Sequence, residues 1–223
     1  MQKKCYYCGK PATTTEHVPP RCLFPEMRDS GGVDYRNNLL TVPSCDEHNA
    51  KKSNDDEYFL FILTCSLDTN AVARNLFLQK VSRAIKRKPN CFSRFVVKPE
   101  KILVIEKNMP QESISFNVDE KRYTKMLLHI IKGIYYTEFK KIIPDESIEI
   151  VYSSAISINP IWDICLAKYN KSIKGIFNVV PYKGNNPEIF RYKIVSDIRT
   201  HIFCMEFYES FVVVGIIREI LET

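Results

Sequence analysis

The spacing of apolar residues changes near residue 45. Before that point apolar residues are scattered among turn-forming prolines and glycines without a sustained period. From Asp46 onward the pattern predicts a helix that continues into the apolar run 58–63. A second helix is expected over 71 to about 86, with Asp68, Thr69 or Asn70 as its N-cap and Pro89 after its end.

The clearest helical period covers 119–141, where apolar residues recur at three- and four-residue steps and Asp119 is a suitable N-cap. The other apolar runs favour strands, which we expect at 92–97, 101–105, 113–118, 148–152, 173–180, 189–194, 201–208 and 211–217. These elements predict an α+β fold with a mainly antiparallel sheet. We expect a small domain over 1–65 and the α+β domain over 66–223.

The composition is that of an ordinary globular chain, with 223 residues, 45% hydrophobic and 26% charged. No apolar run approaches the ~18 residues that span a bilayer. The first residues form no apolar leader, so we expect a cytoplasmic protein without a membrane segment. Eight cysteines are present, and five of them lack paired spacing, which favours reduced thiols over a disulfide framework.

The other three cysteines belong to a pattern of paired metal ligands. Cys5 and Cys8 are separated by two residues, and Cys45 and His48 repeat that spacing. A two-residue gap lets one tight turn present two ligands, and two such turns complete a tetrahedral zinc site. The alternative is two buried thiols and a surface histidine, but that leaves unexplained how a segment so poor in apolar residues folds. Four protein ligands leave no open position for water, so we expect a structural zinc site.

A second group of polar residues lies between and beside these ligands. Glu16 and His17 are adjacent and point opposite ways if they lie in a strand, and Asn49 directly follows a zinc ligand. An imidazole suits the activation of water, and carboxylate and amide oxygens suit a hard cation such as Mg²⁺. Each residue alone is compatible with a turn or surface role, whereas together they form a set suited to a general base and a hard metal, the two requirements of phosphodiester hydrolysis.

The order of these residues over about 5–57 resembles the HNH family of metal-dependent nucleases, also called the ββα-metal fold. The family pattern is an Asp-His pair, then Asn-Leu, then a second knuckle followed by His-Asn. In this chain Glu16 stands where Asp is usual, and Asn38 begins the Asn-Leu pair. His48 takes the place of the second cysteine of the later knuckle, and Asn49 that of the last histidine.

The resemblance implies specific roles for these residues. His17 is expected to be the general base, with Asn38 holding its imidazole in orientation. Glu16 and Asn49 are expected to bind the catalytic metal, Mg²⁺ or Mn²⁺. Lys51 or Lys52 is expected to contact phosphate.

The distribution of charge adds a nucleic-acid partner to this picture. The net charge is +6, and basic residues gather between 74 and 98. Taken alone this stretch is a solvated face, but beside a nuclease motif it favours phosphate binding. The residues expected to contact nucleic acid there are Arg83, Lys86, Arg87 and Lys88.

The sequence therefore predicts a metal-dependent HNH endonuclease acting on DNA. By analogy with HNH modules fused to other domains, a bacterial anti-phage or restriction system is the expected context. A homodimer would allow cleavage of both strands. Three alternatives stay open: a zinc module that binds nucleic acid without cleaving it, a nuclease subunit that needs a partner such as an ATPase, and an RNase.

Overall fold

The computed structural model describes residues 3–66, 69–106, 108–153, 175 and 177–219. Its α-helices are α1 Ser53–Thr64, α2 Ala71–Leu76, α3 Ser82–Arg87, α4 Pro89–Phe92 and α5 Glu120–Phe139. A π-helical turn, Phe77–Val81, joins α2 to α3, and short 3₁₀ turns cover Arg21–Leu23, Met27–Asp29, Ala50–Lys52 and Asp145–Ser147. The strands are β1 Thr14–His17, β2 Thr41–Ser44, β3 Val97–Glu106, β4 Met109–Asn117, β5 Ile148–Ser153, β6 Lys183–Asn186, β7 Phe190–Ser196, β8 Thr200–Phe207 and β9 Phe211–Arg218.

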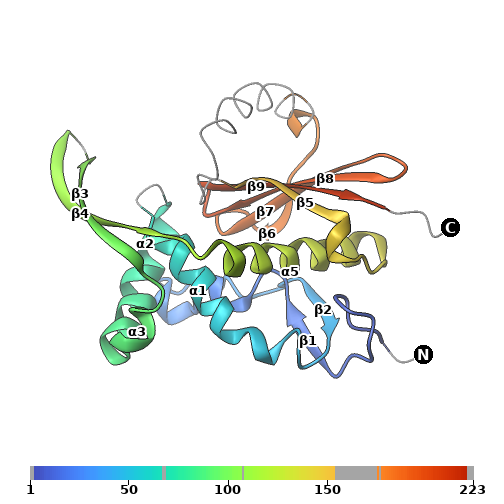
Figure 1. The fold of residues 1–223 in the computed structure, drawn as a ribbon, viewed down its shortest axis with the longest axis horizontal. Coiled ribbons are helices and arrows are strands. Elements are labelled where there is room, and N and C mark those ends of the chain that lie inside the picture. Colours follow the sequence, from blue (N-terminus) through green and yellow to red (C-terminus); the bar gives the residue numbers. More distant parts are fainter. Residues whose placement is uncertain (1–2, 67–68, 107, 154–174, 176, 220–223) are drawn as a thin grey trace.

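These strands form antiparallel sheets, which confirms the expected α+β class. The largest sheet has five strands in the order β5-β9-β8-β7-β6. β1 and β2 form a two-stranded sheet, and β3 and β4 form a hairpin that extends away from the other layers (Figure 1). None of the helices in the described part of the chain combines the length and the apolar character that a bilayer crossing requires.

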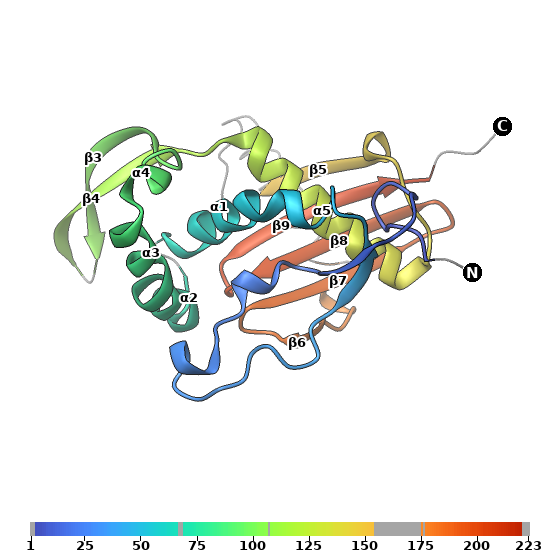
Figure 2. The same ribbon diagram turned by 90° about the horizontal axis from the view of Figure 1, so that it is seen from below.

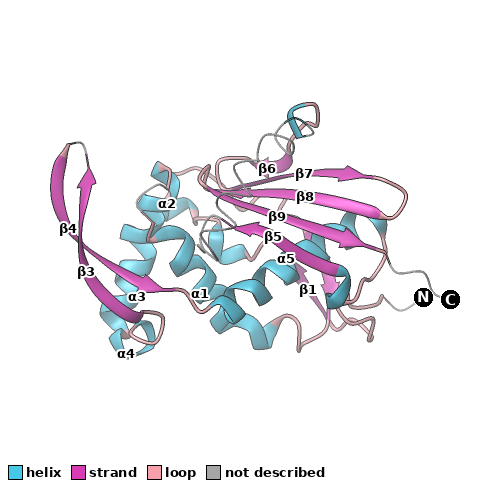
Figure 3. Ribbon diagram, turned by 45° about the horizontal axis from the view of Figure 1, so that its top comes forward, coloured by secondary structure: helices cyan, strands magenta, loops and turns pink. Residues whose placement is uncertain are grey.

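Helix α5 lies between the large sheet and the N-terminal part of the chain (Figures 1 and 2). Its buried stripe includes Tyr123, Ile130 and Ile134, and it contacts both α1 and β2. The five strands form one layer above it (Figure 1), and Figure 3 shows these strands side by side with α5 beneath them. One hydrophobic core extends from Cys5 to Ile217, so the end of α1 near residue 65 does not separate two cores.

Close packing between α5 and the strand that carries His17 depends on a glycine. A Cβ added at Gly133 would lie 2.5 Å from Cγ2 of Val18, the residue directly after β1. No flexible side-chain end lies at this contact to give way. Gly133 therefore sets how near β1 lies to α5.

The expected helices are largely confirmed, and their caps agree with the polar residues before them. Helical residues run from α2 to the end of α3, and the side chain of Asn70 accepts a hydrogen bond from the N–H of Ala73. The side chain of Asp119 accepts one from the N–H of Arg122 at the start of α5. The helix expected from Asp46 begins only at Ser53, because residues 46–49 form the turn that carries His48.

Two strand predictions were wrong in the described residues. The run 92–97 is instead the end of α4 and a turn, because Phe92 and Phe95 both pack their rings against Phe61 of α1. Of the run 173–180, residues 175, 177 and 178 are helical, and the rest of its first half lies outside the described residues. β6 was not expected, since its Lys-Gly-Asn-Asn sequence carries no apolar alternation.

Candidate metal and catalytic site

The four expected zinc ligands lie together. The ligand atoms of Cys5, Cys8, Cys45 and His48 are all within 4.8 Å of one another. Each pair sits in a tight turn: the N–H of Gly9 donates to the carbonyl of Cys5, and the N–H of His48 donates to that of Cys45. This cluster can hold a metal ion such as zinc.

The distances between the ligand atoms fit a tetrahedral ion. Bonds of about 2.3 Å from zinc to sulfur place two sulfurs of a tetrahedron about 3.8 Å apart. The sulfurs of Cys8 and Cys45 are 3.8 Å apart, and Nδ1 of His48 lies 3.2 Å from the sulfur of Cys45 and 3.9 Å from that of Cys5. Burial raises the pKa of Cys5, but backbone N–H groups from both knuckles outweigh it, so its pKa is lowered overall toward the thiolate that zinc requires.

A layer of aromatic and charged side chains fastens this cluster to α5. The ring of Tyr7 stacks on His48 with centroids 4.3 Å apart, and the ammonium of Lys132 lies 3.7 Å from the centre of the Tyr7 ring. The hydroxyl of Tyr7 and the ammonium of Lys132 both donate to Asp145, at 2.8 and 2.5 Å. These contacts join the first knuckle, α5 and the turn before β5.

Glu16 lies in a buried polar cluster with partners of its own. Its side chain is 4% exposed, and Oε1 lies 2.7 Å from Nζ of Lys52, which is 3% exposed. Oε2 accepts from the hydroxyls of Tyr6 and Ser44, at 3.3 and 3.4 Å. The same ammonium lies 2.6 Å from Asp56, so one cation serves two carboxylates.

The protonation of this cluster follows from its burial. Burial raises the pKa of Glu16 to about 7, although the Lys52 ammonium opposes the shift and the charge of Asp56 adds to it. The hydroxyl of Tyr6 also lies 2.8 Å from Nδ1 of His129 on α5. Burial lowers the pKa of His129 to about 2, so this imidazole is neutral at physiological pH. His129 thus acts as a neutral hydrogen-bonding partner in the core.

His17 lies on the other face of β1, as the alternation of a strand predicts. Its side chain is half-buried, whereas Glu16 points into the core. Burial lowers the pKa of His17, and the positive charges of Arg21 and Arg36 lower it further. A neutral imidazole with access to solvent is the state that a general base needs.

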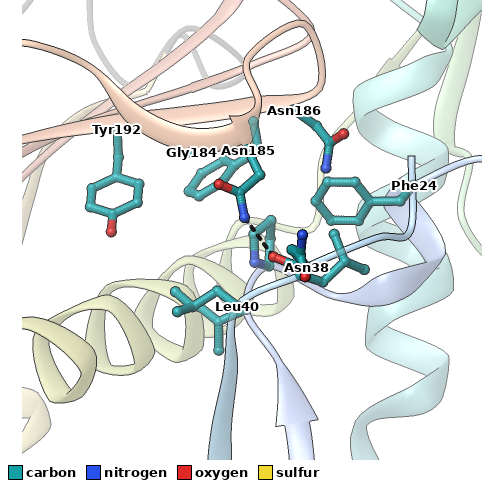
Figure 4. A pocket seen from close by; sticks show the side chains of 11 residues that line it. Phe24, Asn38, Leu40, Gly184, Asn185, Asn186 and Tyr192 are labelled. Carbon is teal, nitrogen blue, oxygen red and sulfur yellow. Dashed lines mark hydrogen bonds between the residues drawn. The ribbon is translucent and has the colours of Figure 1, made fainter. Parts of the chain in front are cut away.

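The two asparagines of the predicted site have contacts of their own. Asn38 is exposed with a positive φ of 53°, and its carbonyl accepts a hydrogen bond of 2.6 Å from the side chain of Asn185 in β6. Asn38 lines a small pocket of about 160 Å³ between the segment before β2 and β6 (Figure 4). The amide of Asn49 donates to Oγ1 of Thr14 and the carbonyl of Thr15 in β1. Within the described residues, no hydrogen bond joins either asparagine to His17.

The predicted phosphate-binding residues differ in their exposure. Lys51 is exposed and Lys52 is buried, so only the first of this pair faces solvent. Arg83 pairs with Asp29 at 2.8 Å while remaining half exposed. The exposed residues at the end of α3 and just after it are Lys86, Arg87 and Lys88.

Sequence reasoning missed two arginines beside His17. Arg21 is exposed, and Arg36 is held by Nε donating to the carbonyl of Phe24 and by an ion pair with Glu26 at 3.1 Å. Both charges act on the His17 imidazole. Their positions inside the motif segment, four and nineteen residues after His17, were the available signal.

Among the described residues, the zinc-type quartet is the one group of three or more histidine, cysteine and carboxylate ligands close enough to share an ion. A second ion near His17 would therefore rely on one or two protein ligands and on water or substrate oxygens. Comparison of the chain with protein-family models, with curated proteins and with solved structures finds no match.

Proposed function

We propose that this chain is a metal-dependent endonuclease of the HNH type that hydrolyses phosphodiester bonds in DNA. The main support is the environment of His17, a half-buried imidazole whose pKa is lowered by burial and by the positive charges of Arg21 and Arg36. It lies on a strand whose partner, β2, leads directly into the second metal knuckle. A neutral base beside two cations suits attack on an anionic phosphate.

The proposed reaction uses His17 to take a proton from water while the water oxygen attacks phosphorus. The bond from phosphorus to the 3′ oxygen breaks and this oxygen takes a proton from solvent water, which leaves a 5′-phosphate and a 3′-hydroxyl. Arg21 and Arg36 supply positive charge near the phosphate, and exposed Lys51 offers a further contact. A bound Mg²⁺ or Mn²⁺ would stabilise charge on the phosphate and the leaving oxygen.

Two protein groups are proposed to hold that ion. Asn49 is anchored to β1 by its amide nitrogen, which leaves its amide oxygen for a ligand role. Glu16 can act as a second ligand only when its carboxylate gives up the ion pair with Lys52 and binds the metal ion instead.

A plasmid-nicking assay with and without Mg²⁺ or Mn²⁺ tests the proposed function. Wild type should nick the plasmid only with the ion, and His17→Ala should abolish nicking. Thr15→Ala is the matched control, because Thr15 lies on the same face of β1 and its side chain is exposed. Loss of nicking in both variants, or in neither, would contradict the role of His17.

A second candidate function is nucleic-acid binding without cleavage. It is favoured by the ion pair between Lys52 and Glu16, since an ammonium occupies the carboxylate that the metal would need. Under this function wild type binds DNA but never nicks it with either ion. Labelled RNA offered in the same assay separates an RNase from a DNase, and activity that appears only with a co-purified protein identifies a partner-dependent nuclease.

A further inference from the structure

A groove outside the His17 region combines positive charge with aromatic surface. Its volume is about 600 Å³, and it lies between the first turn of α1, the end of α3, α4 and the start of α5. Its cationic residues are Arg87, Lys88, Arg94 and Arg122, and its aromatic residues are Phe92 and Phe95. This volume falls in the range of about 300–1,000 Å³ that is typical of small-molecule sites.

The cationic side chains of the groove differ in how many of their donors are already paired within the protein. The guanidinium of Arg122 is held by Asp55 at 2.6 Å, by the carbonyl of Asn54, and over the rings of Tyr58 and Phe95. It therefore forms a rigid wall of the groove.

Three other cations keep donors for a ligand. In the described part of the chain, the side chain of Arg87 donates one hydrogen bond, from Nε to the carbonyl of Arg83. The side chains of Lys88 and Arg94 have no hydrogen-bond or ion-pair partner among the described residues, and both are exposed. Among the described residues, Glu57 is the one acidic residue that lines the groove, so positive charge is in excess there.

The aromatic part gives the groove a second kind of contact. Phe95 is 7% exposed and Phe92 is half-buried, and their rings meet edge-on with centroids 5.2 Å apart. A track for phosphates alone needs only charge, whereas an aromatic surface beneath cations suits a planar base carried on a phosphate chain. The side chains of Asn54 and Glu57 add polar groups at the same wall.

We propose that this groove binds an unpaired nucleotide of single-stranded DNA, which rests on the nuclease function proposed above. The base stacks on Phe92, and the neighbouring phosphates bind Arg87, Lys88 and Arg94. A base within a duplex is stacked on its neighbours and cannot reach the ring. Lys51 lies one helical turn before Asn54, so the same strand can pass from the groove toward the metal knuckle.

Fluorescence anisotropy with labelled oligonucleotides tests this site apart from cleavage. The His17→Ala protein is used without added divalent metal, with a single-stranded DNA and the matching duplex as probes. Single-stranded DNA should bind more tightly than the duplex. Phe92→Leu should weaken single-strand binding by about 5- to 150-fold, the equivalent of ~1–3 kcal/mol of base stacking, and leave duplex binding unchanged.

Two lysines that are two positions apart provide the charge control. Lys86 and Lys88 are both exposed, but only Lys88 lines the groove. Lys88→Gln should weaken binding and reduce the slope of log affinity against log salt by about 0.7, while Lys86→Gln should change both less. Arg94→Gln should act as Lys88→Gln does, and it leaves the aromatic packing in place if Phe92→Leu does not fold.

The possible outcomes distinguish failure of the groove proposal from failure of the proposed nuclease function. Equal effects of Lys86→Gln and Lys88→Gln, or unchanged single-strand binding in Phe92→Leu, would overturn the groove proposal even if the wild type nicks plasmid. If the wild type never nicks but single-strand binding depends on Phe92 and Lys88, the groove stands and the nuclease function fails.

Discussion

Replacement of Lys52 by Met tests whether Glu16 belongs to the core of this protein. The side chain of Lys52 is 3% exposed, and its ammonium lies 2.7 Å from Glu16 and 2.6 Å from Asp56. Met replaces most of the lysine stem but leaves both carboxylates without their cation. Removing one partner of a buried ion pair costs about 3–5 kcal/mol.

For a chain of this length each kcal/mol lowers the melting temperature by about 2–4 °C, so Lys52→Met should lower it by about 6–20 °C. Lys51→Met is the matched control, because Lys51 is exposed and its loss should change stability by about 0.5 kcal/mol or less. The double variant Lys52→Met with Glu16→Gln should recover part of the loss, since it removes one of the stranded carboxylates.

The dependence on pH gives an independent check on the same cluster. The pKa of Glu16 is raised to about 7 in the fold, mainly by burial, so its protonated form is favoured there. The stability that this group contributes is therefore fully present below about pH 4.5 and is lost as pH rises through about 7, in all roughly 3 kcal/mol. Glu16→Gln should remove that part of the slope.

Thermal and urea unfolding of the wild type and these four variants between pH 4.5 and 8 measure both effects. The reasoning fails if Lys52→Met is no less stable than Lys51→Met. That result would mean that Lys52 reaches solvent and that Glu16 is free to bind an ion.

Further predictions follow for the metal, the base and the packing. Purified protein should contain one zinc per chain by elemental analysis, and Cys8→Ser should lose the metal and melt at a lower temperature, because the N-terminal segment depends on it. The acidic limb of the rate profile should have its midpoint below pH 6.5, since the neutral imidazole of His17 is the active form; Arg21→Gln should move that midpoint upward by removing a nearby positive charge. Gly133→Ala should destabilise the fold by about 1–3 kcal/mol in urea unfolding, and Val18→Ala in the same chain should recover part of the loss. The zinc prediction fails if Cys8→Ser keeps its zinc. The prediction for the base fails if Arg21→Gln leaves the midpoint in place, and the packing prediction fails if Val18→Ala recovers none of the stability lost in Gly133→Ala.

The sequence by itself determined the features that depend on short spacings. Two matched knuckles predicted the metal cluster, because a tight turn lets two side chains three positions apart bind the same ion. The three- and four-residue apolar period predicted α5, and Asp119 predicted its start. The alternation of a strand predicted that Glu16 and His17 face opposite ways.

Only the tertiary structure decided which of these residues are buried and what they meet. Glu16 is partnered by Lys52, thirty-six positions away, and Tyr6 by His129 on a helix that sequence spacing does not connect to the knuckle. Of the arginines that act on His17, Arg21 begins a short 3₁₀ turn and Arg36 lies in a turn, and neither belongs to a segment with a periodic pattern. Burial and long-range charge depend on how α5 packs against the N-terminal segment, and no local pattern contains that information.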